Sequence, residues 1–244
     1  MNDWYDSWFE SPWYMRLYRH RSADEARRAV HLMLDVAGIP RSARVLDLCC
    51  GYGRHAMALA EAGYHVTGLD NSTYLIDRAR EVFPHPNVHY VVGDMRGPYP
   101  HAPFDAIVNF FTSFGYFDTH TEHQQVLATM AESVRPGGTV IVDLFNADRV
   151  RSTLVPESMD IMDGVTIIQE RWIDEPFVRK RITINNPCST EQTFEERVWL
   201  YSHTELVAMF TSAGLSVQHV FGTYDGDPFH ESTSERCIVI AQRL

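Results

Sequence analysis

The segment Val45-Leu-Asp-Leu-Cys-Cys-Gly-Tyr-Gly-Arg-His-Ala56 decides the fold of this 244-residue chain. It begins with a mostly apolar run that is typical of a strand buried on both faces of a sheet. Gly51 and Gly53 then turn the backbone, and residues 54–61 favour a helix. Glycine has no Cβ, so the backbone of this turn can lie directly against a ligand, and the N–H groups of the helix start favour an electron-rich group. The segment therefore predicts a strand, a glycine turn and a helix that bind a small molecule carrying a nucleoside.

The rest of the chain alternates between strand and helix patterns up to about residue 145. Helices are expected at 22–37, 72–82 and 119–134, and strands at 64–69, 87–92, 104–111 and 139–144. This alternation is typical of a parallel sheet with helices on both faces. Strand-rich runs follow at 164–173, 177–184 and 193–201, then a helix from 202 and two strands at 215–221 and 237–241. We therefore expect a doubly wound α/β fold with a mostly parallel sheet and an inserted antiparallel β subdomain.

Composition limits the partners that the protein can have. The formal net charge is −11 and the basic residues are scattered, which disfavours a nucleic-acid partner. The four cysteines form no C-x-x-C pair, so neither a zinc site nor a disulfide framework is indicated. Without a signal pattern or a long apolar span, we expect a soluble, cytoplasmic protein with no membrane partner. The sequence leaves the oligomeric state open, with a homodimer as one alternative.

Two nucleoside cofactors fit the glycine turn. Gly51-x-Gly53-x-x-Ala56 matches a dinucleotide fingerprint, and Asp70 lies at about the expected distance downstream, which would suit an NAD(P)-dependent oxidoreductase. Such an enzyme should, however, offer a second mononucleotide-binding half. This chain ends instead in two strands with no helix between them, which predicts an antiparallel pair.

The order of motifs resembles the class I S-adenosylmethionine-dependent methyltransferases. The resemblance is carried by Asp47 with the glycine turn, by Asp70, by Gly93-Asp-Met95 and by Arg135-Pro-Gly-Gly138. It covers about residues 40–145 by motif and 202–244 by pattern. Cys49 departs from the family, because it stands where the first glycine is usual. The segments 93–96 and 111–117 are similar to small-molecule methyltransferases, including glycine and amino-sugar N-methyltransferases. The resemblance implies a Rossmann-like methyltransferase fold with a seven-stranded sheet and S-adenosyl-L-methionine as cofactor.

The resemblance also implies roles for individual residues. Asp70 would accept hydrogen bonds from both ribose hydroxyls, and Asp94 and Met95 would hold the adenine. The cofactor-binding residues that we expect are Tyr14, Tyr18, Arg21, Asp47, Cys49, Gly51, Gly53, Asp70, Asn71, Asp94, Met95, Asn109 and Phe110. Tyr116 is the candidate for contacting the substrate, and His123 is the candidate for a catalytic base. His120 and His123 lack an obvious third ligand, so no metal site is expected.

The chain divides by pattern into three parts. Residues 1–21 are rich in aromatic side chains and would form a cap that packs on the core or closes over a ligand. Residues 22–145 and 202–244 would form the cofactor-binding domain, and residues 146–201 the inserted subdomain, as acceptor pocket or lid. We expect in-line transfer of a methyl group to a nitrogen or oxygen nucleophile of a small molecule. A non-catalytic S-adenosylmethionine-binding protein is the other alternative.

Overall fold

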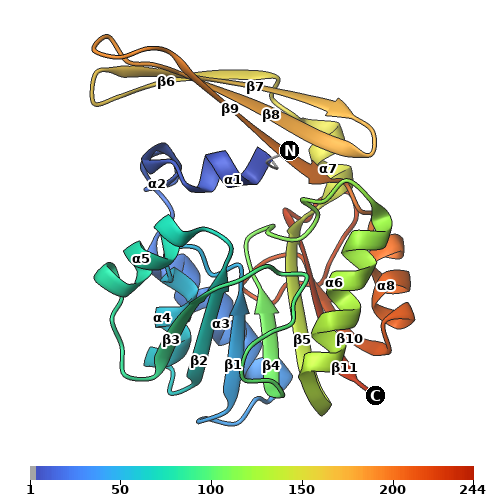
Figure 1. The fold of residues 1–244 in the computed structure, drawn as a ribbon. Coiled ribbons are helices and arrows are strands. Elements are labelled where there is room, and N and C mark those ends of the chain that lie inside the picture. The colour runs from blue at the N-terminus through green and yellow to red at the C-terminus, as the bar shows by residue number, and fades with distance from the viewer. Residues whose placement is uncertain (1–3) are drawn as a thin grey trace.

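The computed structural model describes residues 4–244, and of residues 33–35 it describes the backbone only. Within this range the strands form two sheets, with two short helices between them (Figure 1). The larger sheet has seven strands in the order β10-β11-β5-β4-β1-β2-β3. These are β1 (Arg44–Leu48), β2 (His65–Asp70), β3 (Val88–Val92), β4 (Phe104–Asn109), β5 (Val134–Phe145), β10 (Leu215–Phe221) and β11 (Arg236–Arg243). All pairs are parallel except those of β11, which runs antiparallel to both β5 and β10.

Helices cover both faces of this sheet because its strands are apolar on both sides. On one face lie α3 (Ala23–Ala37), α4 (Arg54–Glu61) and α5 (Thr73–Val82); on the other lie α6 (His120–Ser133) and α8 (His203–Ser212). Alternate residues of β5 show the division. Val140 and Val142 pack in the cluster that contains α6 and α8, whereas Ile141 packs in the cluster of α3 and α4. The predicted doubly wound α/β fold with a seven-stranded, mostly parallel sheet is confirmed.

The second sheet is antiparallel and has the order β6-β7-β8-β9. Its strands are β6 (Glu157–Met162), β7 (Val165–Asp174), β8 (Phe177–Asn185) and β9 (Gln192–Trp199), and α7 (Ala147–Thr153) precedes them. The sequence predicted three of these strands. It missed β6 and α7, although Asp163-Gly164 is a hairpin turn signal, and both residues have positive φ.

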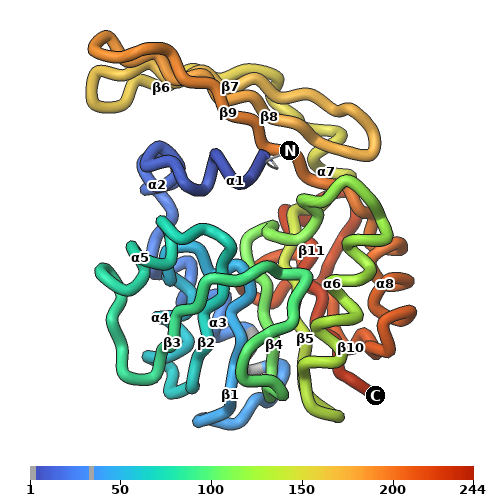
Figure 2. Tube along the Cα trace, in the orientation of Figure 1, coloured from blue at the N-terminus to red at the C-terminus, as the bar shows by residue number. Residues whose placement is uncertain are grey.

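The N-terminal segment forms α1 (Trp4–Phe9) and α2 (Pro12–Leu17), which lie between the two sheets. Their apolar side chains join a separate hydrophobic cluster with β7 and β8, in which Trp8 and Ile167 are fully buried. From α2 the chain continues to the large sheet (Figure 2). We call α1 and α2 the roof, because they cover the edge of the large sheet that faces the second sheet.

The described residues also bear on membrane spans, disulfides and metal sites. Among these residues, no helix has both the length and the hydropathy that are needed to cross a membrane. All four cysteines are free. No group of His, Cys, Asp and Glu side chains in the same residues has the arrangement of a metal site.

Candidate functional site

The glycine turn joins β1 to α4 and is held by a carboxylate from β2. Asp70 Oδ2 accepts a hydrogen bond from Gly51 N at 2.8 Å, and Asp70 Oδ1 accepts one from Ser72 N at 2.9 Å. Burial raises the pKa of Asp70 above its ordinary value. A carboxylate oxygen has two lone pairs, so each oxygen of Asp70 can accept one further hydrogen bond from a ligand.

The space around the backbone differs between the two glycines of the turn. Gly51 has a φ of 55°, and a Cβ there would meet nothing within 4 Å. Its lack of a side chain therefore opens space on the ligand side. A Cβ on Gly53 would lie 2.4 Å from Tyr90 Oη, so Gly53 is required by the packing of Tyr90. Cys49 has a φ of 61°, the left-handed conformation that glycine adopts without strain.

Two polar residues lie beneath the turn, away from the cavity. Asp47 is 1% exposed, and its Oδ2 has no hydrogen-bond partner. Burial, followed by the charge of Asp70, raises the pKa of Asp47 to about 7. The Asn109 amide donates to Leu48 O at 2.9 Å, while its Oδ1 has no partner. Asn109 therefore ties the end of β4 to the end of β1, next to the turn.

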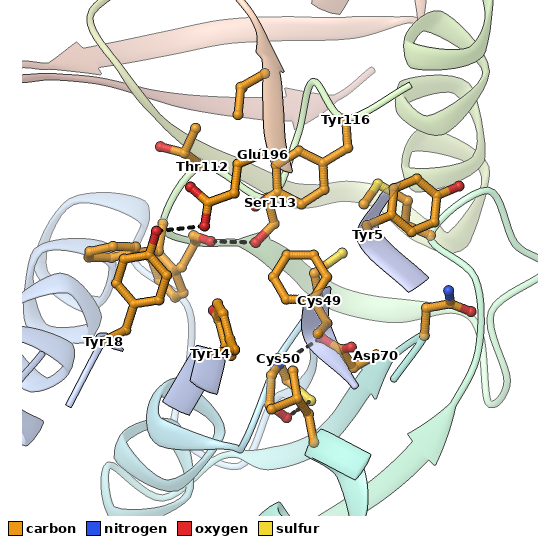
Figure 3. A pocket seen from close by; sticks show the side chains of 18 of the residues that line it. Tyr5, Tyr14, Tyr18, Cys49, Cys50, Asp70, Thr112, Ser113, Tyr116 and Glu196 are labelled. Atoms are coloured by element: carbon orange, nitrogen blue, oxygen red, sulfur yellow. Dashed lines mark hydrogen bonds between the residues drawn. The ribbon is translucent and has the colours of Figure 1, made fainter. Parts of the chain in front are cut away.

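A cavity of about 340 Å³ begins at this turn and extends toward the second sheet (Figure 3). Most of the residues predicted for the site line it: Tyr14, Tyr18, Arg21, Cys49, Gly51, Asp70, Asn71, Asp94, Met95, Phe110 and Tyr116. Four do not: Asp47, Gly53, Asn109 and His123. The structure thus brings the tips of β1, β2, β3 and β4 together with the roof around one space.

At the tip of β3, Asp94 is already paired. Arg96 Nη2 lies 2.6 Å from Asp94 Oδ2. Burial alone would raise the pKa of Asp94, but the hydrogen bonds from Arg96 outweigh it and hold that pKa below its ordinary value. A ligand amino group at this position would therefore meet an ionised carboxylate that it shares with Arg96.

Aromatic rings from the roof and from the loop after β4 form much of the cavity wall. Tyr14 makes edge contacts with Phe9 at 4.9 Å and with Tyr18 at 5.1 Å between ring centroids. Tyr116 contacts Trp4 at 5.0 Å. Burial raises the pKa of Tyr14 to about 12 and also raises the pKa of Tyr116, so both phenols are protonated at neutral pH. Faces of such rings attract cations.

Arg21 supplies a positive charge that lacks an anionic partner. Its guanidinium lies between the rings of Tyr18 and Phe111, with Cζ 3.7 Å and 3.9 Å from their centroids, and its buried Nε has no hydrogen-bond partner. The two other arginines of the wall are paired. Arg54 Nη1 lies 2.7 Å from Glu25 Oε2, and Arg236 pairs with Asp143. Within the described residues, Arg21 is therefore the wall arginine that can receive an anionic group.

His123 is fully buried and does not reach the cavity. Its Nε2 accepts from Phe117 N at 3.0 Å, so the proton is on Nδ1, which lies 2.8 Å from Tyr201 Oη. Burial, with a smaller effect of His120, lowers the pKa of His123 to about 3. His123 thus holds the end of the loop that carries Tyr116.

His55, by contrast, lies in the cavity wall. It is stacked on Phe110 with 4.6 Å between the ring centroids, and its Nε2 is buried without a partner.

The sequence predicted that residues 146–201 would form an acceptor pocket or lid, but it did not identify which residues of the second sheet line the cavity. Glu196 and Val198 of β9 line the cavity, as alternate residues of a strand can. Glu196 accepts from Trp8 Nε1 at 2.7 Å and from Tyr18 Oη at 2.6 Å, and Lys180 Nζ lies 3.1 Å from it. Thr112, Ser113 and Arg236 were missed as well. Side chains alternate between two faces along the strand predicted at 193–201, and this alternation could have pointed to Glu196. The sequence did not indicate, however, which face of that strand meets the ligand.

Comparison with known proteins identifies relatives of this architecture. Residues 45–138 match a methyltransferase domain family. A dTDP-3-amino-3,4,6-trideoxy-alpha-D-glucopyranose N,N-dimethyltransferase of Streptomyces venezuelae is 28% identical over 230 residues, which cover 87% of this chain and 92% of the relative. A cypemycin N-terminal methyltransferase of Streptomyces sp is 28% identical over 206 residues, with 82% and 83% covered. A solved structure of an S-adenosylmethionine-dependent methyltransferase from Clostridium acetobutylicum superimposes with a TM-score of 0.81 at 15% identity, covering 94% of this chain and 96% of that one.

Proposed function

The chain is a class I S-adenosylmethionine-dependent methyltransferase, and from this premise we propose that it methylates an amine nitrogen of a small molecule. Both curated relatives described above are named for amine acceptors, one on an amino sugar and one at a peptide N-terminus. The observation that carries the proposal is the single cavity. It joins Asp70 and Asp94 at the strand tips to Glu196 and Val198 of the second sheet, so that donor and acceptor share one space.

The wall residues fit the cofactor. When bound, S-adenosylmethionine would supply an activated methyl group, which passes to a nucleophile in line with the C–S bond while the sulfur leaves as the thioether of S-adenosylhomocysteine. The free lone pairs of Asp70 support a role for it in binding both ribose hydroxyls. The unpaired guanidinium of Arg21 supports a role in binding the carboxylate of the methionine portion. Asp94 and Met95 would hold the adenine, with Arg96 sharing Asp94.

The state of the wall's carboxylates, phenols and imidazole favours nitrogen over oxygen as the nucleophile. Burial holds the pKa of His55 well below its ordinary value, so this imidazole is a weak base. An alcohol or phenol must lose its proton, whereas an amine that binds unprotonated already offers a lone pair. The three carboxylates of the wall are engaged in hydrogen bonds: Asp70 with backbone N–H groups, Asp94 with Arg96, and Glu196 with Trp8, Tyr18 and Lys180. Tyr14 and Tyr116 are protonated, so neither phenol can take a proton from an acceptor. We therefore assign Tyr116 to acceptor contact, and His123 to support of the loop in place of a base.

The lining of the same cavity supports a separate role for each part of the chain. We propose that residues 1–21 close the site and that residues 146–201 form the acceptor side, while 22–145 and 202–244 hold the donor. We further propose a cytoplasmic enzyme whose acceptor is a free small molecule and which has no nucleic-acid partner. The net charge of −11 and the free cysteines support this. A homodimer stays a hypothesis that sedimentation can test.

Calorimetry and a turnover assay test the proposal directly. We expect the protein to bind S-adenosylhomocysteine and not NAD. In a panel of amines, phenols and carboxylates, we expect S-adenosylhomocysteine to form only with amines, at a rate that rises with pH until the acceptor amine is unprotonated. Turnover with phenols alone would assign the reaction to oxygen. Binding without turnover on any class would favour a non-catalytic binding protein.

A further inference from the structure

The loop after β4 has an unusual backbone where it enters the cavity wall. Phe111 and Thr112 have φ values of 64° and 62°, two successive left-handed residues that are not glycine. This conformation is strained for side chains with a Cβ, and more so for Thr, which is β-branched. Such a conformation persists only where the surroundings enforce it. Both residues, and Ser113 after them, line the cavity.

A fully buried carboxylate enforces this conformation. Asp143, on β5, is 0% exposed. Phe111 N donates to Asp143 Oδ2 at 2.9 Å, and Thr112 N donates to Asp143 O at 2.8 Å. One side chain and its own carbonyl thus hold both left-handed residues.

Two further side chains complete the cluster from the C-terminal part of the chain. Tyr224 Oη donates to Asp143 Oδ2 at 2.6 Å, and Arg236 Nε donates to Asp143 Oδ1. Burial, together with the Asp143 carboxylate, raises the pKa of Tyr224, so its phenol remains a donor. Arg236 Nη2 also lies 3.3 Å from Thr112 Oγ1, which accepts from Phe145 N at 3.1 Å.

Neither Asp143 nor Tyr224 lines the cavity, so neither can touch the substrate directly. Resting on the function proposed above, we propose that Asp143 and Tyr224 are positioning residues for methyl transfer, which fix Phe111, Thr112 and Ser113 as the wall that orients the acceptor. In-line displacement depends on alignment, and a misplacement of about 1 Å can cost about 100-fold in rate.

The decisive variant is Tyr224→Phe, which removes one hydroxyl and keeps the ring. The matched control is Tyr64→Phe, because Tyr64 is fully buried and donates to Ile39 O at 3.1 Å, outside the cavity wall. We expect Tyr224→Phe to lower kcat about 10-fold or more. The dissociation constant for S-adenosylhomocysteine should stay within about 3-fold, because Asp70 and the glycine turn are held by their own hydrogen bonds and not by Tyr224. Tyr64→Phe should retain both values.

Hydrogen exchange supplies a measurement that needs no acceptor. Exchange of the amides at 111 and 112 should accelerate about 10-fold or more in Tyr224→Phe and not in Tyr64→Phe. Asp143→Asn, where it folds, should show a larger change in the same direction.

The inference fails if exchange at these amides is unchanged in Tyr224→Phe, or if kcat stays within about 2-fold although exchange accelerates. It also fails if Tyr64→Phe loses as much kcat. A wild-type protein that transfers methyl to no acceptor would refute the proposed function instead, and the exchange result would still report on the loop.

Discussion

At the scale of single residues, backbone conformation explains where this chain departs from the methyltransferase pattern that it resembles. Cys49 occupies the place of the first family glycine, and its φ of 61° is the conformation for which glycine is suited. The backbone of the turn therefore has the same conformation with Cys49 as with glycine, and the Cβ of Cys49 makes this conformation less stable by about 1–2 kcal/mol. The side chain that results lines the cavity. Cys49 is thus a point at which the donor side of this protein differs from the family pattern.

Asp70→Ala should weaken binding of S-adenosylhomocysteine by about 1–3 kcal/mol, because ribose hydroxyls lose their acceptors. It should also lower the melting temperature, since Gly51 N and Ser72 N lose their partner. Calorimetry and thermal unfolding measure the two effects. Asp105→Ala is the matched control: Asp105 accepts from Arg44 N at 2.7 Å and pairs with Arg135, but it does not line the cavity. Equal losses of affinity in both variants would show that Asp70 acts through stability alone.

The cavity-lining residues at the strand tips were predictable because each follows a strand within a local motif. Asp70 ends β2, and Asp94 closely follows β3. Glu196 and Arg236 were not predictable, because they meet the cavity only through pairing of distant strands. Gly53 was assigned to the cofactor, but its packing against Tyr90 involves a residue 37 positions away, which no local pattern reveals.

At the scale of elements, helix starts were the most predictable features and edge elements the least. Ser22, Thr119 and Ser202 each cap the helix that the sequence predicted there. In contrast, β6 has a mostly exposed burial pattern, so its side chains do not show the alternation by which strands are recognised. The roof helices are six residues each, too short for a helical period, and tertiary packing stabilises them.

The stability of the fold should depend on pH through His123. This residue lies on α6 and accepts a hydrogen bond from the loop after β4. In the unfolded chain a histidine takes up a proton near pH 6.5, whereas folded His123 does so only near pH 3. Between these values the unfolded state binds more protons, so stability should fall as pH falls, by up to about 1 kcal/mol per pH unit. His123→Gln should flatten this slope between pH 7 and pH 5 in denaturant unfolding. His203→Gln, which replaces a half-buried ring at the start of α8, is the control variant; parallel slopes in all three proteins would contradict the prediction.

At the scale of the whole molecule, the buried side chains form three clusters, two on the faces of the large sheet and one between the roof and the second sheet. The third cluster is centred on Trp8, which is fully buried, contacts Phe194 at 4.8 Å and bonds to Glu196. The roof therefore packs with the second sheet as one body. This arrangement was foreseen only as a cap over core or ligand, because aromatic content does not reveal the partner surface.

Trp8→Ala should loosen the roof and the second sheet while the large sheet stays intact. Truncation of a buried Trp costs about 3–5 kcal/mol, and here the loss falls on the third cluster. Hydrogen exchange should accelerate in β7 and β8 and remain slow in β1, β4 and β5. Trp172→Ala, which removes a half-buried ring of β7 outside this cluster, should change exchange far less. Uniform acceleration across both sheets would show that the molecule unfolds as one unit.

The second sheet reaches the cavity through β9, where Glu196 and Val198 are two positions apart. In directed evolution, the first round of mutagenesis can therefore be limited to the codons for Glu196 and Val198 in β9. Under the proposed division of the cavity, a library at these codons would sample new acceptors, while Asp70 and Asp94, at the tips of other strands, stay unchanged.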